Sequence, residues 1–292
     1  MKFKSILALV LALLMLLSCA SCGEPDRPLL EGADDPALTK GANLRIMSYN
    51  ILAELWNDLA SQTLPGREEL FLDVIHSYQP DVIGLQEVSR KWHRLLNPLI
   101  EGEYAWAGET LPNTTIPNYS TILYNVKTVE LIECGTTIYT TCDLPEARNL
   151  TWARFKHKKS KKEFIVTSTH WGIYEEDRIE NQPENVTLIN ELFEKYNLPI
   201  FATGDYNSNE EALFKPFLEG TGMVDPKFNA EIVNRATKTT HKLTQPLAND
   251  TGLAIDHIAV TKGVRILYYN VLICPTTINA SDHFPVYIDV KI

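Results

Sequence analysis

The sequence predicts a layered domain of mixed α/β (α+β) class, and three observations support this. Strand-like apolar runs are interspersed with segments of helical period, which is typical of layered α/β and α+β domains. Several of the apolar runs end in short polar motifs that contain acidic residues or histidine. The chain has 292 residues, of which 45% are hydrophobic and 22% charged, enough for one large globular domain with a substantial core. We place this domain at residues 43–292.

The first half of the domain begins with a strand and a helix. Leu44–Tyr49 is a strand-like run, and Arg67–Ser77 has apolar residues at helical spacing. Pro80 limits continuation of that helix before a second strand at Asp81–Leu85. Four further strands are expected, the last two as a hairpin around a lysine-rich turn: Thr121–Tyr124, Val129–Ile132, Thr151–Phe155 and Glu163–Thr169.

The second half repeats this mixture of elements. Asn185–Tyr196 has helical period, and Pro199 precedes a strand at Ile200–Thr203. The remaining elements are expected to be a short helix at Glu211–Leu218 and strands at Ile255–Val260, Val264–Leu272 and Val286–Ile292. Phe228–Gly252 carries little periodic signal, so we expect a loop there with one short element near the mouth of the site.

The N-terminus has the layout of a processing segment. Lys2 and Lys4 precede an apolar run, Ile6–Leu17, that is too short to span a bilayer comfortably. The following Leu-Leu-Ser-Cys resembles a bacterial lipoprotein signal, in which Cys19 would be lipidated and become the new N-terminus. Cys22 is the alternative lipidation site, and a plain secretory signal or an uncleaved anchor is the alternative to a lipoprotein.

We therefore assign residues 1–22 to the signal region and residues 23–42, rich in Glu, Pro, Asp and Gly, to a flexible tether. The expected location is the extracytoplasmic face of the cell membrane. Export permits disulfides. Cys134 and Cys142 are close enough in sequence to pair, although pairing cannot be read from spacing, and Cys274 has no obvious partner.

The charge balance bears on possible partners. The formal net charge is −10, which disfavours binding of a long polyanion, since Lys and Arg contacts to phosphates supply most non-specific affinity. One basic run, Lys156–Lys162, lies between two predicted strands. We interpret it as the solvated tip of a hairpin in preference to a nucleic-acid patch.

Polar motifs at strand ends carry the chemistry. Strand ends that meet at one edge of a sheet bring distant carboxylates and imidazoles together, and such a cluster can hold a hard divalent cation and a phosphate. Six motifs have this placement: Ser48-Tyr49-Asn50, Leu85-Gln86-Glu87, Ser168-Thr169-His170-Trp171, Gly204-Asp205-Tyr206-Asn207, Ile255-Asp256-His257 and Ser281-Asp282-His283.

In order and rough spacing these motifs resemble those of the endonuclease/exonuclease/phosphatase family, which has the DNase I-like fold. The resemblance runs from about residue 43 to the C-terminus, and the joint presence of Gly-Asp-Tyr-Asn and Ser-Asp-His makes it specific. It implies a four-layer α/β sandwich, two packed β-sheets flanked by helices. It also implies Mg²⁺ (or Mn²⁺) and hydrolysis of phosphomonoesters or phosphodiesters.

The resemblance implies a role for each motif residue. Glu87 would bind the metal, Asn50 would position the metal or a phosphate oxygen, and Asp282 could serve a second metal site or polarise a neighbour. Asp205 would activate the attacking water, and Asn207 would bind that water or the pentavalent intermediate. The remaining roles fall to two histidines and an acid: Asp256 would orient His283 toward the scissile phosphate, and His170 would donate to a phosphate oxygen or protonate the leaving group.

Two further residues are implied to contact the substrate phosphate. Arg148 lies where relatives place a cationic residue, and Tyr119 matches an active-site tyrosine of the abasic-site nuclease branch. Leu52 stands where that branch has an acidic residue, which argues against membership in it.

Taken singly, each motif has a structural explanation. Asn50 could be a cap, Glu87 an exposed loop acid, and Asp205 to Asn207 a turn. His257 is expected to be packed rather than a ligand, because it alternates away from Asp256 along the strand. A last group is assigned to structural or loop roles: Asp225, His241 and Asp250.

The sequence as a whole predicts an exported, monomeric, metal-dependent phosphoesterase that uses activated water. Candidate substrates are extracellular nucleic acid, phospholipid head groups, and small phosphodiesters or inositol phosphates. The acidic charge tilts the expectation toward a small or lipid phosphoester. The alternatives are an extracellular nuclease and a non-catalytic surface binding protein that retains the fold.

Overall fold

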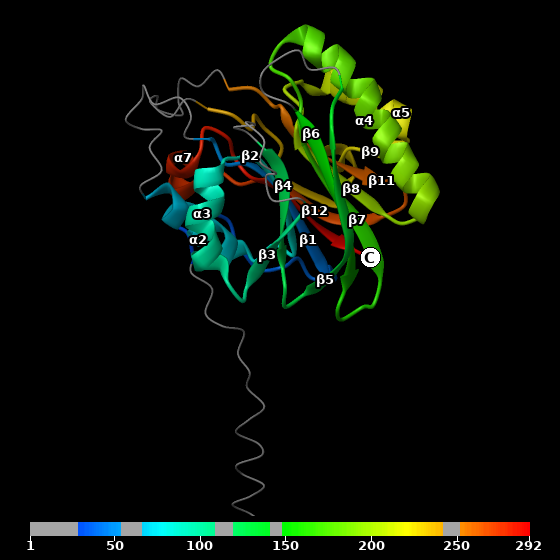
Figure 1. Ribbon diagram of the computed structural model, residues 1–292. Coiled ribbons are helices and arrows are strands. Elements are labelled where there is room, and N and C mark those ends of the chain that lie inside the picture. The colour runs from blue at the N-terminus through cyan, green and yellow to red at the C-terminus, as the bar shows by residue number, and fades with distance from the viewer. Residues whose placement is uncertain (1–28, 54–65, 109–118, 141–147, 242–251) are drawn as a thin grey trace, which may run out of the picture.

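Two β-sheets packed face to face form the centre of the protein in a computed structural model (Figure 1). The structure describes residues 29–53, 66–108, 119–140, 148–241 and 252–292. In these ranges the first sheet has the order β10 (Ile232–Arg235), β12 (Arg265–Val271), β13 (Val286–Lys291), β1 (Leu44–Asn50), β2 (Val82–Val88), β4 (Tyr119–Asn125) and β3 (Tyr104–Ala107). The second has the order β5 (Val129–Ile138), β6 (Asn149–His157), β7 (Glu163–His170), β8 (Ile200–Asp205), β11 (Asp256–Thr261) and β9 (Met223–Val224).

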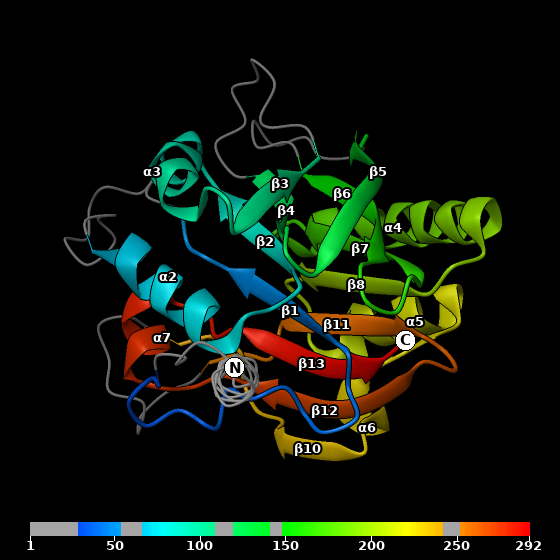
Figure 2. The same ribbon diagram turned by 90° about the horizontal axis from the view of Figure 1, so that it is seen from below.

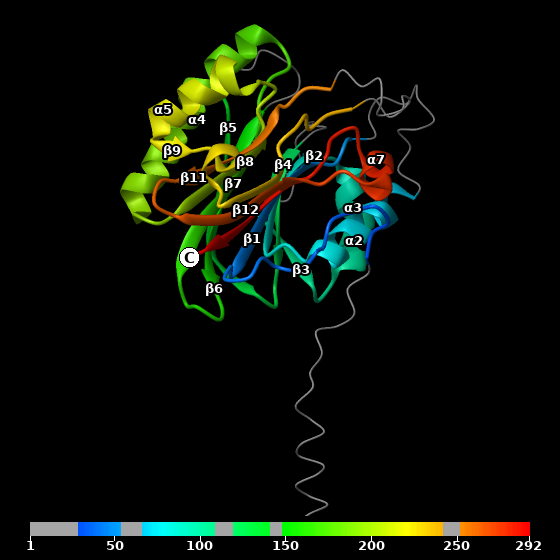
Figure 3. The same cartoon turned by 180° about the vertical axis from the view of Figure 1, so that it is seen from behind.

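Helices cover the outer face of each sheet and complete four layers, as the views from below and behind show (Figures 2 and 3). The first sheet is covered by α2 (Arg67–Tyr78), α3 (Arg90–Ile100) and α7 (Pro275–Ala280). The second is covered by α4 (Glu175–Tyr196) and α5 (Lys215–Thr221), the latter preceded by a π-helical turn at Glu210–Phe214, while the short α6 (Pro226–Asn229) contacts β11 and β12. The predicted four-layer sandwich of the DNase I-like fold is confirmed.

The sheets pack closely because the facing side chains are apolar or very small. Residues such as Ile46, Phe164 and Phe201 form the core between the sheets. Gly84 of β2 faces Thr203 of β8, and a Cβ at Gly84 would lie 1.7 Å from the Thr203 hydroxyl oxygen. A glycine is therefore required for this approach of the two sheets.

Several elements extend or add to those expected from the sequence. Helix α3 has Trp92, Leu96 and Ile100 buried on one face, and Ser89 caps it by accepting the Trp92 N–H at 3.1 Å. Helix α4 begins at Glu175, ten residues before the predicted start, and continues through Pro183. Other additions to the expected elements are short: β3, α6, α7 and β9. The short strand β10 lies in the stretch expected to contain one short element near the mouth of the site, and it pairs with β12 at the outer edge of the first sheet.

The described part of the predicted tether lies against the domain. Arg45, almost fully buried, binds both carboxylate oxygens of Asp289 at 2.6 and 2.8 Å and donates to the carbonyls of Pro36 and Ala37. Thr39 donates its N–H and its hydroxyl to Asp289 as well. Residues 36–39 are thus fixed by the network around Arg45, and the domain includes part of the segment expected to be flexible.

The lipidation predictions concern residues outside the described ranges, since Cys19 and Cys22 precede residue 29. None of the helices within those ranges is long and apolar enough to cross a membrane. Cys134 is exposed and has no disulfide partner among the described residues, and Cys142 lies outside them, so their pairing stays a prediction.

Candidate active site

The predicted motifs meet at one edge of the sandwich. Strands β1 and β2 are parallel with Asn50 opposite Gln86, and β7 and β8 are parallel with His170 opposite Asp205. Antiparallel β11 begins at Asp256, which pairs with Asp205. We call this the motif edge, and it contains six side chains that the sequence predicted to converge: Asn50, Glu87, His170, Asp205, Asp256 and His283.

Asp205 is the centre of the cluster. Its Oδ2 accepts the Asn50 side-chain amide at 3.0 Å and lies 3.3 Å from His170 Nε2 and 3.8 Å from His283 Nε2. Its Oδ1 accepts the Asn207 backbone N–H at 2.9 Å. Burial, followed by the charge of Asp256, raises the pKa of Asp205 to about 7. A carboxylate with such a pKa is suited to accept a proton near neutral pH.

Asn50 connects Asp205 to Glu87. Its Nδ2 donates to Glu87 Oε1 at 3.2 Å as well as to Asp205, while its Oδ1 accepts the Leu52 N–H. Glu87 Oε2 accepts the Ala53 N–H at 2.8 Å. In this arrangement the Asn50 amide acts as a hydrogen-bond donor to two carboxylates, and its predicted role as a metal ligand stays a prediction.

The backbone at the motif edge adopts left-handed conformations that L-residues rarely use. Glu87 has a φ of 61° and Asn207 a φ of 46°. Asn tolerates this region through local hydrogen bonds, but for Glu it is uncommon and is imposed by the surroundings. From this position Glu87 directs its carboxylate into the cluster. The pKa of Glu87 is raised mainly by burial and, to a smaller extent, by the charge of Asp282.

Asp256 and His283 form a buried pair. His283 Nδ1 lies 2.8 Å from Asp256 Oδ2, which also accepts the Thr239 hydroxyl at 2.6 Å. Burial acts to lower the pKa of His283, but Asp256, Asp282 and Asp205 together raise it well above its ordinary value. His283 is therefore held as an imidazolium cation beside the centre of the cluster.

His170 has the opposite protonation state. Burial, followed by the nearby charges of Arg148 and His283, lowers its pKa well below the ordinary value. His170 is therefore neutral where His283 is cationic, and paired titratable groups with pKa values pushed apart are typical of acid–base sites.

The loop that carries His283 is fixed by hydrogen bonds that the sequence did not predict. Ser281 Oγ donates to the Asn50 carbonyl at 2.7 Å and accepts the His283 N–H at 3.1 Å. His241 Nε2 lies 2.8 Å from the Ser281 carbonyl, and the His241 backbone N–H donates to the backbone carbonyl of Asp282. His241 is structural, as expected, but its place against this loop had no sequence signal. Thr239 was also missed, because an isolated threonine in an aperiodic stretch carries no pattern.

A buried arginine supports the neighbouring loop. Arg67, predicted only as the start of a helix, donates to the carbonyls of Ile51, Leu52 and Ala280. Its guanidinium lies over the ring of Trp92. It therefore ties the segment after β1 to the end of α7, and through them positions both Asn50 and the Ser281 loop.

The remaining predicted residues are all placed at or near the motif edge. Arg148 is buried beside His170, and Tyr119 is buried at the start of β4, opposite Val88. Their contacts with a phosphate stay predictions. His257 is packed, as expected: its ring stacks on Phe214 at 4.0 Å and its Nε2 lies 2.9 Å from the Ser208 carbonyl.

The donor set fits a hard divalent cation. Asp205, Asp256 and His283 offer ligand atoms within 4.8 Å of one another. Both nitrogens of His283 already face carboxylates, however, so this trio is better suited to hydrogen bonding than to metal binding. The charge of Asp282 raises the pKa of Glu87, and Asp282 Oδ1 is buried, 4.0 Å from His283 Nε2, with no hydrogen bond from the described residues. A cation between these two carboxylates would satisfy both.

The chain belongs to the endonuclease/exonuclease/phosphatase family, whose model matches residues 47–283. The family's enzymes generally depend on divalent metal ions, and the carboxylates at the motif edge are the type of group that holds such an ion. No curated protein matches the sequence significantly.

Solved structures show the same fold. An endonuclease/exonuclease/phosphatase from Bacteroides vulgatus superposes with a TM-score of 0.74 at 23% identity, covering 85% of this chain and 98% of its own. The mannosyl-6-phosphatase of Bacteroides thetaiotaomicron gives 0.72 at 21%, covering 85% and 100%. The human Nocturnin catalytic domain with bound sulfate gives 0.68 at 20%, covering 91% and 99%.

Proposed function

We propose that the protein is an exported, metal-dependent phosphoesterase that hydrolyses a phosphomonoester or phosphodiester by in-line attack of activated water. The observation that carries the proposal is the environment of Asp205. This buried carboxylate has a pKa of about 7 and lies within 4 Å of two imidazoles with opposite protonation states. Family membership supports the same reaction class.

Asp205 is the proposed general base. A base is most effective when its pKa lies near the working pH, and burial beside Asp256 gives Asp205 that property. The Asn50 amide and the Asn207 backbone N–H hold the carboxylate in a fixed orientation. Asp205 would take the proton of the water as its oxygen attacks phosphorus, and Asn207 would keep that water in line.

The two histidines have different proposed roles. His283, kept cationic by Asp256, would stabilise the negative charge that develops on the phosphoryl oxygens. Neutral His170 would donate a hydrogen bond to a phosphate oxygen or to the leaving group, beside the positive charge of Arg148. A divalent ion held by Glu87 and Asp282 would supply Lewis-acid neutralisation of charge.

The proposed substrate is a small or lipid phosphoester. The acidic net charge of −10 disfavours long polyanions, and one solved neighbour is named as a mannosyl-6-phosphatase. An extracellular nuclease is the alternative, because other structural neighbours include a protein complexed with single-stranded DNA product. The N-terminal motif around Cys19 supports attachment to the outer face of the membrane.

A panel assay tests the proposal. The purified protein is incubated with bis-p-nitrophenyl phosphate, mannose 6-phosphate, sphingomyelin, RNA and plasmid DNA, with Mg²⁺, Mn²⁺ or EDTA. Turnover that EDTA abolishes supports a metal-dependent phosphoesterase, and preferred cleavage of RNA or DNA would favour the nuclease alternative. Binding of a panel member without turnover under any metal condition would favour a non-catalytic surface protein.

A further inference from the structure

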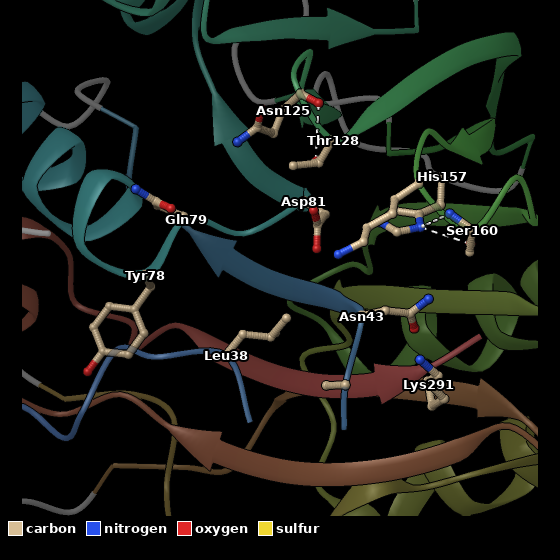
Figure 4. A pocket seen from close by; sticks show the side chains of 12 residues that line it. Leu38, Asn43, Tyr78, Gln79, Asp81, Asn125, Thr128, His157, Ser160 and Lys291 are labelled. Atoms are coloured by element: carbon tan, nitrogen blue, oxygen red, sulfur yellow. Dashed lines mark hydrogen bonds between the residues drawn. The ribbon is translucent and has the colours of Figure 1, made fainter. Parts of the chain in front are cut away.

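A pocket lined by apolar, polar and charged side chains lies at the edge of the sandwich opposite the motif edge. It has a volume of about 620 Å³, within the range of sites for small molecules. It forms where β1 and β2 begin and where β4, β6 and β13 end, so we call this the opposite edge. Figure 4 shows Asn43, Asp81, His157, Ser160 and Lys291 around this space, and no residue of the pocket belongs to the cluster at the motif edge.

One wall of the pocket is rich in positive charge and hydrogen-bond donors. Lys159 and Ser160 come from the basic turn between β6 and β7, and Lys291 comes from the end of β13. Both lysines are close enough to His157 to lower its pKa, after the larger effect of burial. The lysines at 158, 159, 161 and 162 are exposed in this turn, as expected for a solvated hairpin tip, and Lys159 also lines the pocket.

The tautomer of His157 adds another donor. Its Nδ1 accepts the backbone N–H of Ser160 at 3.1 Å, and a backbone N–H can only donate. The proton of the neutral ring must therefore be on Nε2. His157 is 94% buried, so its ring position is fixed by the fold rather than by solvent. The pocket thus combines two ammonium groups with an imidazole N–H, a set of donors that matches a carboxylate or phosphate group.

The other wall contains a buried acceptor. Asp81 is 93% buried, and its Oδ2 accepts the Arg45 backbone N–H at 2.7 Å while the Thr128 hydroxyl also bonds to the carboxyl group. The surrounding backbone is fixed as well, because Asn43 exchanges two hydrogen bonds with Ile292, at 3.3 and 2.9 Å. A carboxyl group can accept more hydrogen bonds than these two. Asp81 can therefore also accept a hydrogen bond from a hydroxyl group of a ligand.

We propose that this pocket is a binding site for a small hydroxylated anion. The anionic group of the ligand faces Lys159, Lys291 and the Nε2–H of His157, and a hydroxyl group donates to Asp81. The site is separate from the proposed phosphoesterase site, because its residues lie at the opposite ends of the same strands. No residue of the motif-edge cluster is therefore needed to bind a ligand in the pocket.

Titration calorimetry on EDTA-treated protein tests the proposal. The probes are sodium D-gluconate and glycerol 3-phosphate, two hydroxylated anions that differ in the charged group, with sodium acetate as the bare carboxylate. The pocket variant is Lys159→Ala/Lys291→Ala. The matched control is Lys161→Ala/Lys162→Ala, which removes the same number of charges, both from the basic turn that carries Lys159, without touching the pocket lining. His283→Ala reports on binding at the motif edge.

The expected result is saturable binding of gluconate or glycerol 3-phosphate, weakened about tenfold or more in the pocket variant and unchanged in both other variants. Tighter binding of gluconate would identify a carboxylate as the preferred group, and tighter binding of glycerol 3-phosphate would identify a phosphate. Equal weakening in the two lysine variants would show general charge attraction and overturn the proposal. Loss only in His283→Ala, no saturation below ~10 mM, or acetate binding as tightly as gluconate would also overturn it.

Discussion

The two edges of the sandwich contain similar side chains in different surroundings. At the motif edge the buried Asp205 lies beside His170, His283 and Asn50, with a pKa of about 7. At the opposite edge the buried Asp81 has a pKa of about 6, again raised mainly by burial, but a backbone N–H and a hydroxyl bind it. A raised carboxylate pKa alone therefore does not define an active site. The imidazoles directed at Asp205 make the difference.

The largest expected effect separates the two edges. Asp205→Ala and His283→Ala should each lower turnover by about a thousandfold or more, because one removes the base and the other the cationic donor. Asp81→Asn is the matched control, a change at a buried carboxyl with a raised pKa, and it should leave turnover unchanged. Steady-state hydrolysis of the preferred panel substrate measures this. Normal rates in both motif-edge variants would refute the site.

The next effect concerns the partner of His283. Asp256→Asn should reduce turnover by roughly a hundredfold to ten-thousandfold, because an amide neither fixes the imidazole tautomer nor holds its positive charge. The rate measured from pH 5 to 9 should also change shape, since the pKa of His283 falls toward its ordinary value. An unchanged pH profile would show that Asp256 has only a packing role.

A smaller effect is expected one step farther from the reaction. Thr239→Val removes the hydroxyl that donates to Asp256 Oδ2 and should lower kcat by about tenfold, the usual scale for a supporting hydrogen bond of this kind. Thr239→Ser keeps the hydroxyl and should restore most of the rate. If serine and valine behave alike, the methyl packing of Thr239 matters rather than its bond.

The smallest predicted change is a shift in a titration curve. In metal-free protein the Asp205 carboxyl should titrate near pH 7, and Asp256→Asn should lower that midpoint by removing a like charge. Carbon-13 NMR of the labelled Asp205 carboxyl measures the titration midpoint in the wild type and in Asp256→Asn.

The same shift has a stability consequence. Because the folded-state pKa of Asp205 is raised above 3.8, its contribution favours folding at acid pH and is lost as pH rises from about 4 to 7. Asp205→Asn should therefore gain stability relative to the wild type over that range, in thermal unfolding of metal-free protein. A difference that is flat with pH would contradict the raised pKa.

The sequence predicted the elements that carry long periodic patterns and the residues in recognisable motifs. Asn50, Glu87 and Asp205 come together because parallel strands end at one edge, and His283 joins them because the antiparallel strand β13 begins there. Helix α3 had a signal, with Trp92, Leu96 and Ile100 four residues apart after a capping serine, but Pro98 within it obscured the pattern.

Other parts of the site could not be predicted, because they depend on tertiary contacts between residues distant in sequence. Thr239 contacts Asp256, His241 contacts Ser281, and Arg67 joins Ile51 to Ala280. No local period or spacing distinguishes such residues from ordinary loop or helix positions. The pocket at the opposite edge was missed for the same reason, since Asp81, His157 and Lys291 belong to three separate strand ends.

The most direct test of the central claim is hydrolysis of bis-p-nitrophenyl phosphate and mannose 6-phosphate by wild type, Asp205→Ala and Asp81→Asn, each with Mg²⁺ and with EDTA. We expect turnover of at least one substrate by wild type and Asp81→Asn with Mg²⁺, and none by Asp205→Ala or with EDTA. Hydrolysis that persists in EDTA or in Asp205→Ala would contradict a metal-dependent site centred on Asp205.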